Sequence, residues 1–338
     1  MKKKTQEELS KEIFSQTNNS KNIAVLISEP DQDSVGSGLA LKEILKVLNK
    51  ESDLYSSFSV DKFHYLPNIK QYTVQDIANI KLKGYDTIFV LDASQLYRLV
   101  DVKMYPNGIT LPKKSTVINI DHHNDNPGFG SINYIGSQKI SSTAEALYVI
   151  FNDKVSFSPS IATNLLAGLI EDTGCFRHAF TSQTLRIVAD LIDKKGDYNM
   201  LVNQIYYSNS KRIVRANVKC LSNLSFKKAG KYSYAYSIVK PKDFGIEVPR
   251  RSDIRILQET MKSISGIDFS MRITPLAKNI TDISLRSRDV KVASIAEHFK
   301  GGGHDRAAGT TVRMDVKTFL RELNNFLRKT NLSRETRL

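Results

Sequence analysis

The sequence predicts an α/β protein in which a doubly wound parallel sheet is followed by a smaller α+β domain. Three short apolar runs, residues 23–27, 87–91 and 116–120, each precede a carboxylate by a few residues. Short apolar strands that alternate with helices are typical of a parallel sheet buried on both faces. Because ligands of such sheets bind at the carboxyl ends of the strands, we expect a functional site there.

The other elements follow from the spacing of apolar residues. Helical spacing predicts helices near residues 5–18, 41–48, 144–150 and 161–170, and residues 182–224 are mostly helical in pattern. Strand patterns occur at 232–239, 268–273 and 282–285. We therefore expect a first domain over residues 1–192, a helical linker over 193–224 and a second domain over 225–338.

Composition excludes several classes of protein. The 338 residues are 41% hydrophobic and 25% charged, which excludes disordered, collagenous and disulfide-stapled chains. A formal net charge of +14 favours an anionic partner such as nucleic acid, a nucleotide or an acidic membrane. The chain has two cysteines, a polar segment where a signal peptide would be apolar, and no run of about 18 apolar residues. A soluble, cytoplasmic protein without a membrane partner is the expectation.

Acidic and imidazole side chains stand near the ends of the predicted strands or in loops that enter helices. They are Asp31, Asp33, Asp92, His122 and Asp172. Carboxylates that converge at one sheet edge repel each other unless cations lie between them. Oxygen ligands with one or two imidazoles suit Mn²⁺ or Mg²⁺, with cobalt or iron as alternatives, and a pair of such ions can clamp a phosphate. A lone strand-terminal Asp is more often a helix cap, but the order of these residues along the chain favours a metal site.

Two sets of motifs then resemble a known family. Asp31-x-Asp33, Asp92, Asp121-His122-His123 and Asp172-Thr173-Gly174 resemble the four motifs of the DHH phosphoesterase superfamily, as does the segment 141–145. Residues 283–287, 299–304 and 307–309 resemble the DHH-associated C-terminal domain. The resemblance covers about residues 20–315. The length and the pairing of the two domains are similar to those of the branch that acts on short oligoribonucleotides and on 3′-phosphoadenosine 5′-phosphate (pAp). The resemblance also implies an active-site cleft between the domains.

The resemblance implies a two-metal centre, with Mn²⁺ expected first and Mg²⁺ or Co²⁺ as alternatives. Asp31 and Asp92 would hold one ion, and Asp33, Asp92, His122 and Asp172 would hold the other. Asp121 would orient the metal-binding imidazole, and His123 would stabilise charge at the scissile phosphate. The implied substrate-binding residues are Arg286, Ser287, Gly301, Gly302, Gly303 and His304. Glycines let backbone N–H groups approach a phosphate, although a tight turn would also explain this triplet.

One position departs from the family pattern. Ile27 stands where the family usually has a histidine, so the first metal site lacks an imidazole. Glu29 lies two residues before Asp31 and is a candidate substitute ligand, with a solvated loop residue as the alternative. Ile27 itself faces either the core or the metal cleft, and a weakened first site is one expected consequence.

The residues and the resemblance together predict a metal-dependent phosphohydrolase that degrades short oligoribonucleotides from an end, removes the 3′-phosphate of pAp, or does both. One alternative is a phosphodiesterase of cyclic di-adenosine monophosphate or of its linear product pApA. Another is a nucleic-acid-binding protein whose metal site has degenerated through Ile27. Retention of the other ligand positions and of His123 favours the enzyme, and the resemblance allows a homodimer.

Overall fold

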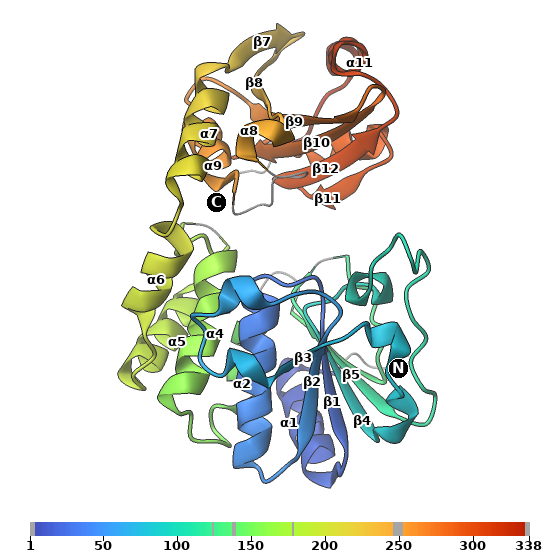
Figure 1. Cartoon of the computed structure of the whole chain (residues 1–338), viewed down its shortest axis with the longest axis vertical. Coiled ribbons are helices and arrows are strands. Elements are labelled where there is room, and N and C mark those ends of the chain that lie inside the picture. The colour runs from blue at the N-terminus through green and yellow to red at the C-terminus, as the bar shows by residue number, and fades with distance from the viewer. Residues whose placement is uncertain (1–3, 124, 137–139, 178, 246–252, 335–338) are drawn as a thin grey trace. The chain divides into compact units, whose positions relative to one another are not determined.

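The computed structural model describes residues 4–123, 125–136, 140–177, 179–245 and 253–334 (Figure 1). The chain divides into two compact units, Met1–Ser208 and Asn209–Leu338. The segment predicted as a linker is shared between them, because helix α6 (Tyr198–Tyr206) belongs to the first unit and α7 (Lys211–Ser222) to the second. The three-part division and the cleft between the domains stay predictions.

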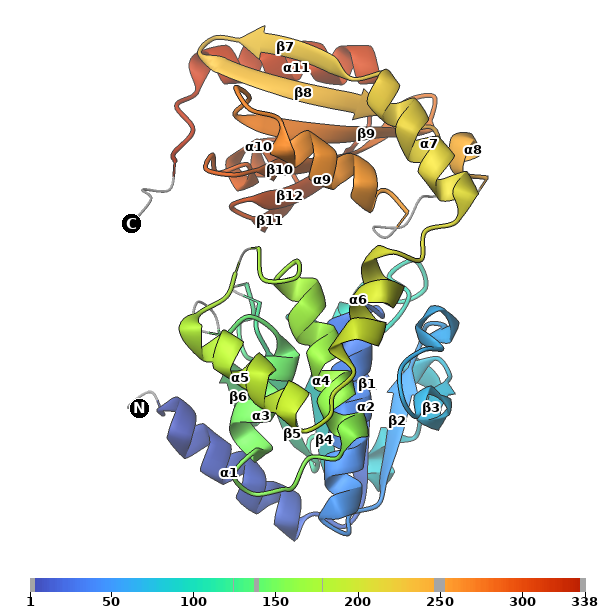
Figure 2. The same ribbon diagram turned by 90° about the vertical axis from the view of Figure 1, so that its left-hand side faces the viewer.

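The first unit is built on a six-stranded parallel sheet with the order β3-β2-β1-β4-β5-β6. Figure 1 labels β1 to β5, and Figure 2 labels β6. Its strands are β1 (Ile23–Ile27), β2 (Ser52–Ser56), β3 (Tyr72–Val74), β4 (Thr87–Leu91), β5 (Thr116–Asp121) and β6 (Ile132–Ile135). The predicted strands β1, β4 and β5 are confirmed and lie side by side, where an apolar run is buried on both faces. The sequence did not predict β2, β3 and β6, which are partly exposed and less uniformly apolar.

Helices cover one face of this sheet. The core on that face contains side chains of α1 (Gln6–Asn19), α2 (Gln32–Val47), α3 (Thr143–Phe151), α4 (Pro159–Asp172), α5 (Ser182–Asp193) and α6. The helices predicted in this unit are therefore confirmed. Short 3-10 turns and loops cover the opposite face, which includes Leu26 and Val90. The sheet is thus buried on both faces as expected, but α-helices provide the cover on only one.

The second unit is the predicted α+β domain. Its mixed sheet has the order β11-β12-β10-β9-β8-β7, in which only β8 and β9 pair in parallel (Figure 2). The strands are β7 (Ser225–Ala229), β8 (Tyr232–Ile238), β9 (Phe269–Ala277), β10 (Ile280–Ser287), β11 (Gly302–His304) and β12 (Ala307–Val312). Helices α10 (Ala293–His298) and α11 (Val316–Lys329) share one core with the sheet. A second core joins α7, α8 (Pro241–Phe244) and α9 (Arg255–Ser263).

Candidate metal centre

The ends of three neighbouring strands in the first unit bring the acidic motifs together. The register pairs Ile27 of β1 with Leu91 of β4, and Leu91 with Ile120 of β5. Strand order reverses between β1 and β4, and ligands of open α/β sheets bind at such a switch point. Asp92 follows β4 directly and Asp121 ends β5, so both lie at this edge.

Four of the predicted ligands, Asp33, Asp92, His122 and Asp172, form what we call the metal cluster. His122 Nε2 lies 3.3 Å from Asp172 Oδ2 and 3.6 Å from Asp92 Oδ1. Donor atoms of Asp33, His122 and Asp172 lie within 4.8 Å of one another, as do those of Asp92, His122 and His123. Asp172 Oδ2 is buried and makes no hydrogen bond with the described residues. This set of carboxylate oxygens and an imidazole nitrogen fits a divalent cation such as Mn²⁺ or Mg²⁺.

Asp33 enters the metal cluster from the first turn of α2. The backbone N–H of Thr143 donates to Asp33 Oδ2 at 2.7 Å, and that of Ala144 donates to Oδ1 at 2.9 Å. Gly168 of α4 makes room for this carboxylate, because a Cβ at Gly168 would clash with Asp33 Oδ1. Burial, and then the charge of Asp31, raises the pKa of Asp33 to about 6. A nearby cation would favour its charged form.

Asp92 is held in an uncommon backbone conformation. It is 2% exposed and has a φ of +54°, in the left-handed region that residues other than glycine seldom adopt. Its Oδ1 accepts from the Thr143 hydroxyl at 3.3 Å, and its Oδ2 accepts from the Ser28 hydroxyl at 3.4 Å. Burial, followed by the charges of neighbouring carboxylates, raises the pKa of Asp92 and of Asp172 well above the usual value. A bound cation would relieve this repulsion.

Asp121 hydrogen-bonds the second histidine of its motif. Asp121 Oδ1 lies 2.7 Å from His123 Nδ1, and Oδ2 accepts from Asn126 Nδ2 at 2.6 Å. Burial raises the pKa of Asp121, but the hydrogen bonds with His123 and Asn126 outweigh it, so the pKa is lowered. The resemblance implied that Asp121 orients the metal-binding imidazole, whereas its hydrogen bond here is to His123. The sequence did not predict the role of Asn126, since a polar loop residue is unremarkable by itself.

The residues of the loop after β1 lie outside the two groups of donor atoms described above. Ile27 is fully buried in the core that includes α2, so the core-facing interpretation of this residue holds. Asp31 caps α2 by accepting from the Ser34 N–H at 2.9 Å, and it lies outside both groups of donor atoms. Glu29 is exposed and also lies outside these groups. The roles of Asp31 and Glu29 as metal ligands stay predictions.

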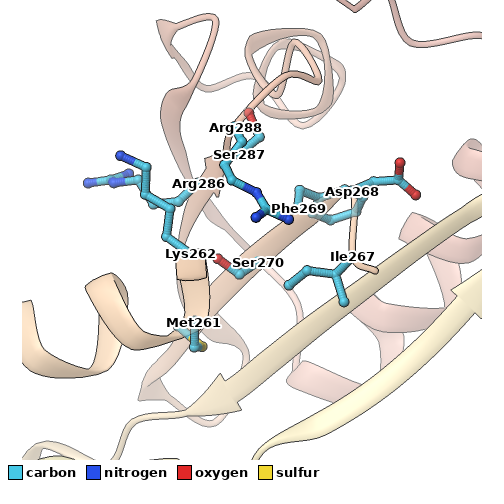
Figure 3. Close-up of a pocket in the computed structure, with 9 residues that line it drawn as sticks. All are labelled: Met261, Lys262, Ile267, Asp268, Phe269, Ser270, Arg286, Ser287 and Arg288. Atoms are coloured by element: carbon cyan, nitrogen blue, oxygen red, sulfur yellow. The ribbon is translucent and has the colours of Figure 1, made fainter. Parts of the chain in front are cut away.

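In the second unit, Arg286 and Ser287 line a pocket near the end of β10 (Figure 3). The other lining residues are Met261, Lys262, Ile267, Asp268, Phe269, Ser270 and Arg288. Arg286 donates to Ser284 Oγ at 2.9 Å, and the buried Ser287 hydroxyl donates to the Val290 carbonyl, which shapes the turn after β10. Ser270 Oγ is buried and has no hydrogen-bond partner among the described residues. Basic side chains around a hydroxyl suit an anion such as a phosphate.

The three consecutive glycines at positions 301–303 differ in the structural reason for having no side chain. A Cβ at Gly301 would clash with the Gly309 carbonyl, and a Cβ at Gly303, whose φ is +132°, would press on the backbone of β12. Gly302 has open space where a Cβ would lie. Close packing therefore explains two of the three positions. His304 belongs to β11, and its side chain lies outside the described part of the structure.

Comparisons with known proteins agree with this architecture. A family model described as "DHH family, N-terminal domain" matches residues 22–169, and one described as "DHHA1 domain" matches residues 232–329. A curated relative from Thermus thermophilus, named bifunctional oligoribonuclease and PAP phosphatase NrnA, is 30% identical over 84% of this chain and 82% of its own.

Two solved structures share the fold. An exopolyphosphatase-related protein from Bacteroides fragilis superposes with a TM-score of 0.80 at 23% identity, covering 96% of this chain and 98% of its own. RecJ from Thermus thermophilus, solved in complex with Mn²⁺, has a TM-score of 0.50 at 12% identity, covering 98% of this chain and 56% of RecJ.

The metal cluster and these relatives define a metal-dependent hydrolase of phosphoester bonds. The chain belongs to the DHH family, and a DHHA1 domain follows its DHH domain. Within the described residues, none of the helices is long and apolar enough to cross a membrane.

Proposed function

We propose that this protein degrades short oligoribonucleotides from an end and removes the 3′-phosphate of pAp. The observation that carries the proposal is the metal cluster, where ligands from four separate motifs meet at the switch point of the first sheet. The substrate class is supported by the Thermus relative, whose name states both activities.

The residues of the first unit have distinct tasks in this reaction. Asp31 and Asp92 would hold one divalent cation, and Asp33, Asp92, His122 and Asp172 would hold the other. When bound, such cations would supply an activated water molecule and would neutralise charge on the phosphate oxygens. His123 is hydrogen-bonded to Asp121 through Nδ1, so Nε2 is the nitrogen that would face the substrate. There it stabilises the charge that develops on the leaving oxygen.

The second unit would bind the substrate. Arg286 and Ser270 are cross-strand neighbours that both line the pocket, and the guanidinium of Arg286 supports phosphate binding by a charge-assisted hydrogen bond (Figure 3). Gly302 supports a close approach of substrate to the backbone, because its Cβ position is open. The predicted roles of Ser287, Gly301, Gly303 and His304 in substrate binding rest on the family resemblance.

A substrate panel tests this function. The purified protein is stripped of metal, supplied with Mn²⁺, Mg²⁺, Co²⁺ or EDTA, and given short RNAs, pAp, cyclic di-adenosine monophosphate, pApA or short DNA, with products resolved by length. We expect metal-dependent release of mononucleotides from short RNA and of phosphate from pAp. Preferred cleavage of the cyclic dinucleotide or pApA would support the phosphodiesterase alternative. RNA binding without any hydrolysis would support the non-catalytic one.

Three finer points complete the proposal: Mn²⁺ as the preferred ion, a homodimeric assembly and a cytoplasmic location. The oxygen-rich ligand set supports Mn²⁺ or Mg²⁺ over softer metals. The dimer and the location rest on the family resemblance and the cysteine content. Metal analysis of the purified protein and light scattering during gel filtration test the first two.

A further inference from the structure

Thr143 lies where two carboxylates of the metal cluster meet. It is the first residue of α3 and is fully buried. Its backbone N–H donates to Asp33 Oδ2 at 2.7 Å, and its hydroxyl donates to Asp92 Oδ1 at 3.3 Å. One residue therefore contacts a carboxylate from α2 and another from the end of β4.

The backbone contact alone does not depend on the side chain at position 143. The first N–H groups of an α-helix lack partners within the helix, and Asp33 accepts two of them, from Thr143 and Ala144. Any residue except proline would supply this N–H. The contact with Asp92, in contrast, requires a hydroxyl on Cβ, which only serine and threonine provide.

The hydrogen bond from Thr143 affects the orientation of Asp92 Oδ1. This oxygen lies 3.6 Å from His122 Nε2 and also 3.6 Å from His123 Nδ1, so it faces both imidazoles. The Ser28 hydroxyl contacts the other oxygen at a longer distance of 3.4 Å. A rotation of the carboxylate would move Oδ1 away from the imidazoles, and the hydrogen bond from Thr143 opposes that rotation.

We propose that Thr143 is a positioning residue of the metal centre, whose hydroxyl orients Asp92 while its backbone N–H holds Asp33. The separation of these two ligands is thereby set before a cation binds. The inference rests on the proposed metal-dependent function, but it concerns affinity for the cation and not the choice of substrate. Residues that hydrogen-bond metal ligands typically contribute about 10- to 100-fold to metal affinity or activity.

Two pairs of proteins that differ by one hydroxyl test the proposal: the wild type against Thr143→Val, and Thr143→Ser against Thr143→Ala. All four keep the N–H that binds Asp33. Mn²⁺ binding to the stripped full-length chain is measured by calorimetry, melting temperature in EDTA, and kcat and KM on the best substrate of the panel. Thr17→Val is the control, because Thr17 is equally buried and its hydroxyl donates only to the Ile13 carbonyl within α1.

We expect the Val and Ala variants to bind Mn²⁺ at least about tenfold more weakly than their partners and to lose kcat at unchanged KM. The Ser variant and Thr17→Val should bind Mn²⁺ like the wild type. If Thr143→Val does not fold, the Ser and Ala pair decides.

Equal Mn²⁺ affinity within the pairs overturns the proposal, and so does a Ser variant as impaired as the Ala variant. If the Mn²⁺ affinity falls only in variants whose melting temperature in EDTA also falls, the side chain of Thr143 has a packing role, and the proposal is overturned as well. A wild type that binds no Mn²⁺ is a different result, in which the proposed function fails and this inference with it.

Discussion

The two units of the chain differ in net charge and in where their charged side chains lie. Residues 1–208 contain 22 Lys and Arg against 23 Asp and Glu, whereas residues 209–338 contain 27 against 12. The second unit therefore carries the whole positive excess of the protein. In the first unit, Asp33, Asp92 and Asp121 are at most 2% exposed, whereas Arg288 and Lys227 of the second unit are exposed.

This difference separates two physical tasks. Cation binding and attack on phosphorus need charged groups at fixed distances in a site with little water. Attraction of a polyanion needs only a net positive field, which acts over a Debye length of about 8 Å at physiological ionic strength. Single substitutions should therefore be severe in the first unit and graded in the second.

The largest effect should come from Asp92→Asn. Asparagine tolerates the left-handed φ of this position but cannot supply the charge, so we expect kcat to fall at least about a thousandfold, equal to about 4 kcal/mol. In EDTA its melting temperature should rise, because one of several buried like charges is gone. Kinetics with Mn²⁺ and thermal melts check both, with the exposed Glu51→Gln as control. Wild-type kcat in Asp92→Asn would remove this residue from the metal centre.

The next effect is a pH dependence of stability confined to the metal-free first unit. The pKa of Asp33 is about 6 in the folded protein against an ordinary 3.8, so between these values the folded state binds more protons than the unfolded state. The free energy of unfolding should therefore fall as pH rises through about 4 to 6, and the raised pKa values of Asp92 and Asp172 act in the same direction. Denaturant titrations in EDTA measure it, and Asp33→Asn should weaken the dependence. Mn²⁺ at pH 7 should restore the lost stability; the same pH profile with and without Mn²⁺ would show that no cation binds there.

Arg286→Ala should have a graded effect on substrate use. Loss of a charged hydrogen-bond donor should lower kcat/KM on short RNA by about 10- to 100-fold, with Mn²⁺ affinity unchanged. A small aryl phosphate that does not reach the pocket should be affected less. Lys227→Ala on β7, an exposed position, should change only the salt dependence. Equal losses on RNA and on the aryl phosphate would contradict a recognition role for Arg286.

The smallest effect should come from Ile27→His. Because Ile27 is buried in the core, the imidazole should cost about 1–3 kcal/mol of stability without improving Mn²⁺ affinity. Melts in EDTA and Mn²⁺ titrations measure the two quantities, with Ile27→Val as the control that keeps the site apolar. A gain in Mn²⁺ affinity would show that this side chain reaches the cleft after all.

The companion variant Glu29→Ala tests whether Glu29 is the substitute metal ligand. An unchanged Mn²⁺ affinity in this variant would eliminate that role for Glu29.

Strong local patterns explain which elements were predictable. Strands β1, β4 and β5 are largely apolar and buried along almost their whole length, and such a run is stable in the interior of a sheet. Strands β2 and β3 expose side chains and take their conformation from pairing with a neighbour, so their own sequence carries little signal. The short 3-10 turns over the second face of the sheet likewise depend on packing against the apolar side chains of that face.

The sequence by itself determined the donors of the site, their order along the chain and the excess of positive charge in the second half. These follow from residue type and from position after an apolar run, which are local properties. Only the tertiary structure decided which group each donor contacts: Asp33 meets a backbone N–H 110 residues away, and Ile27 turns inward. Asp92 accepts from the Thr143 hydroxyl, and the missing Cβ of Gly168 makes room for Asp33. The physical reason is that hydrogen-bond partners and free space arise from the packing of helices and strands distant in sequence, which no local pattern records.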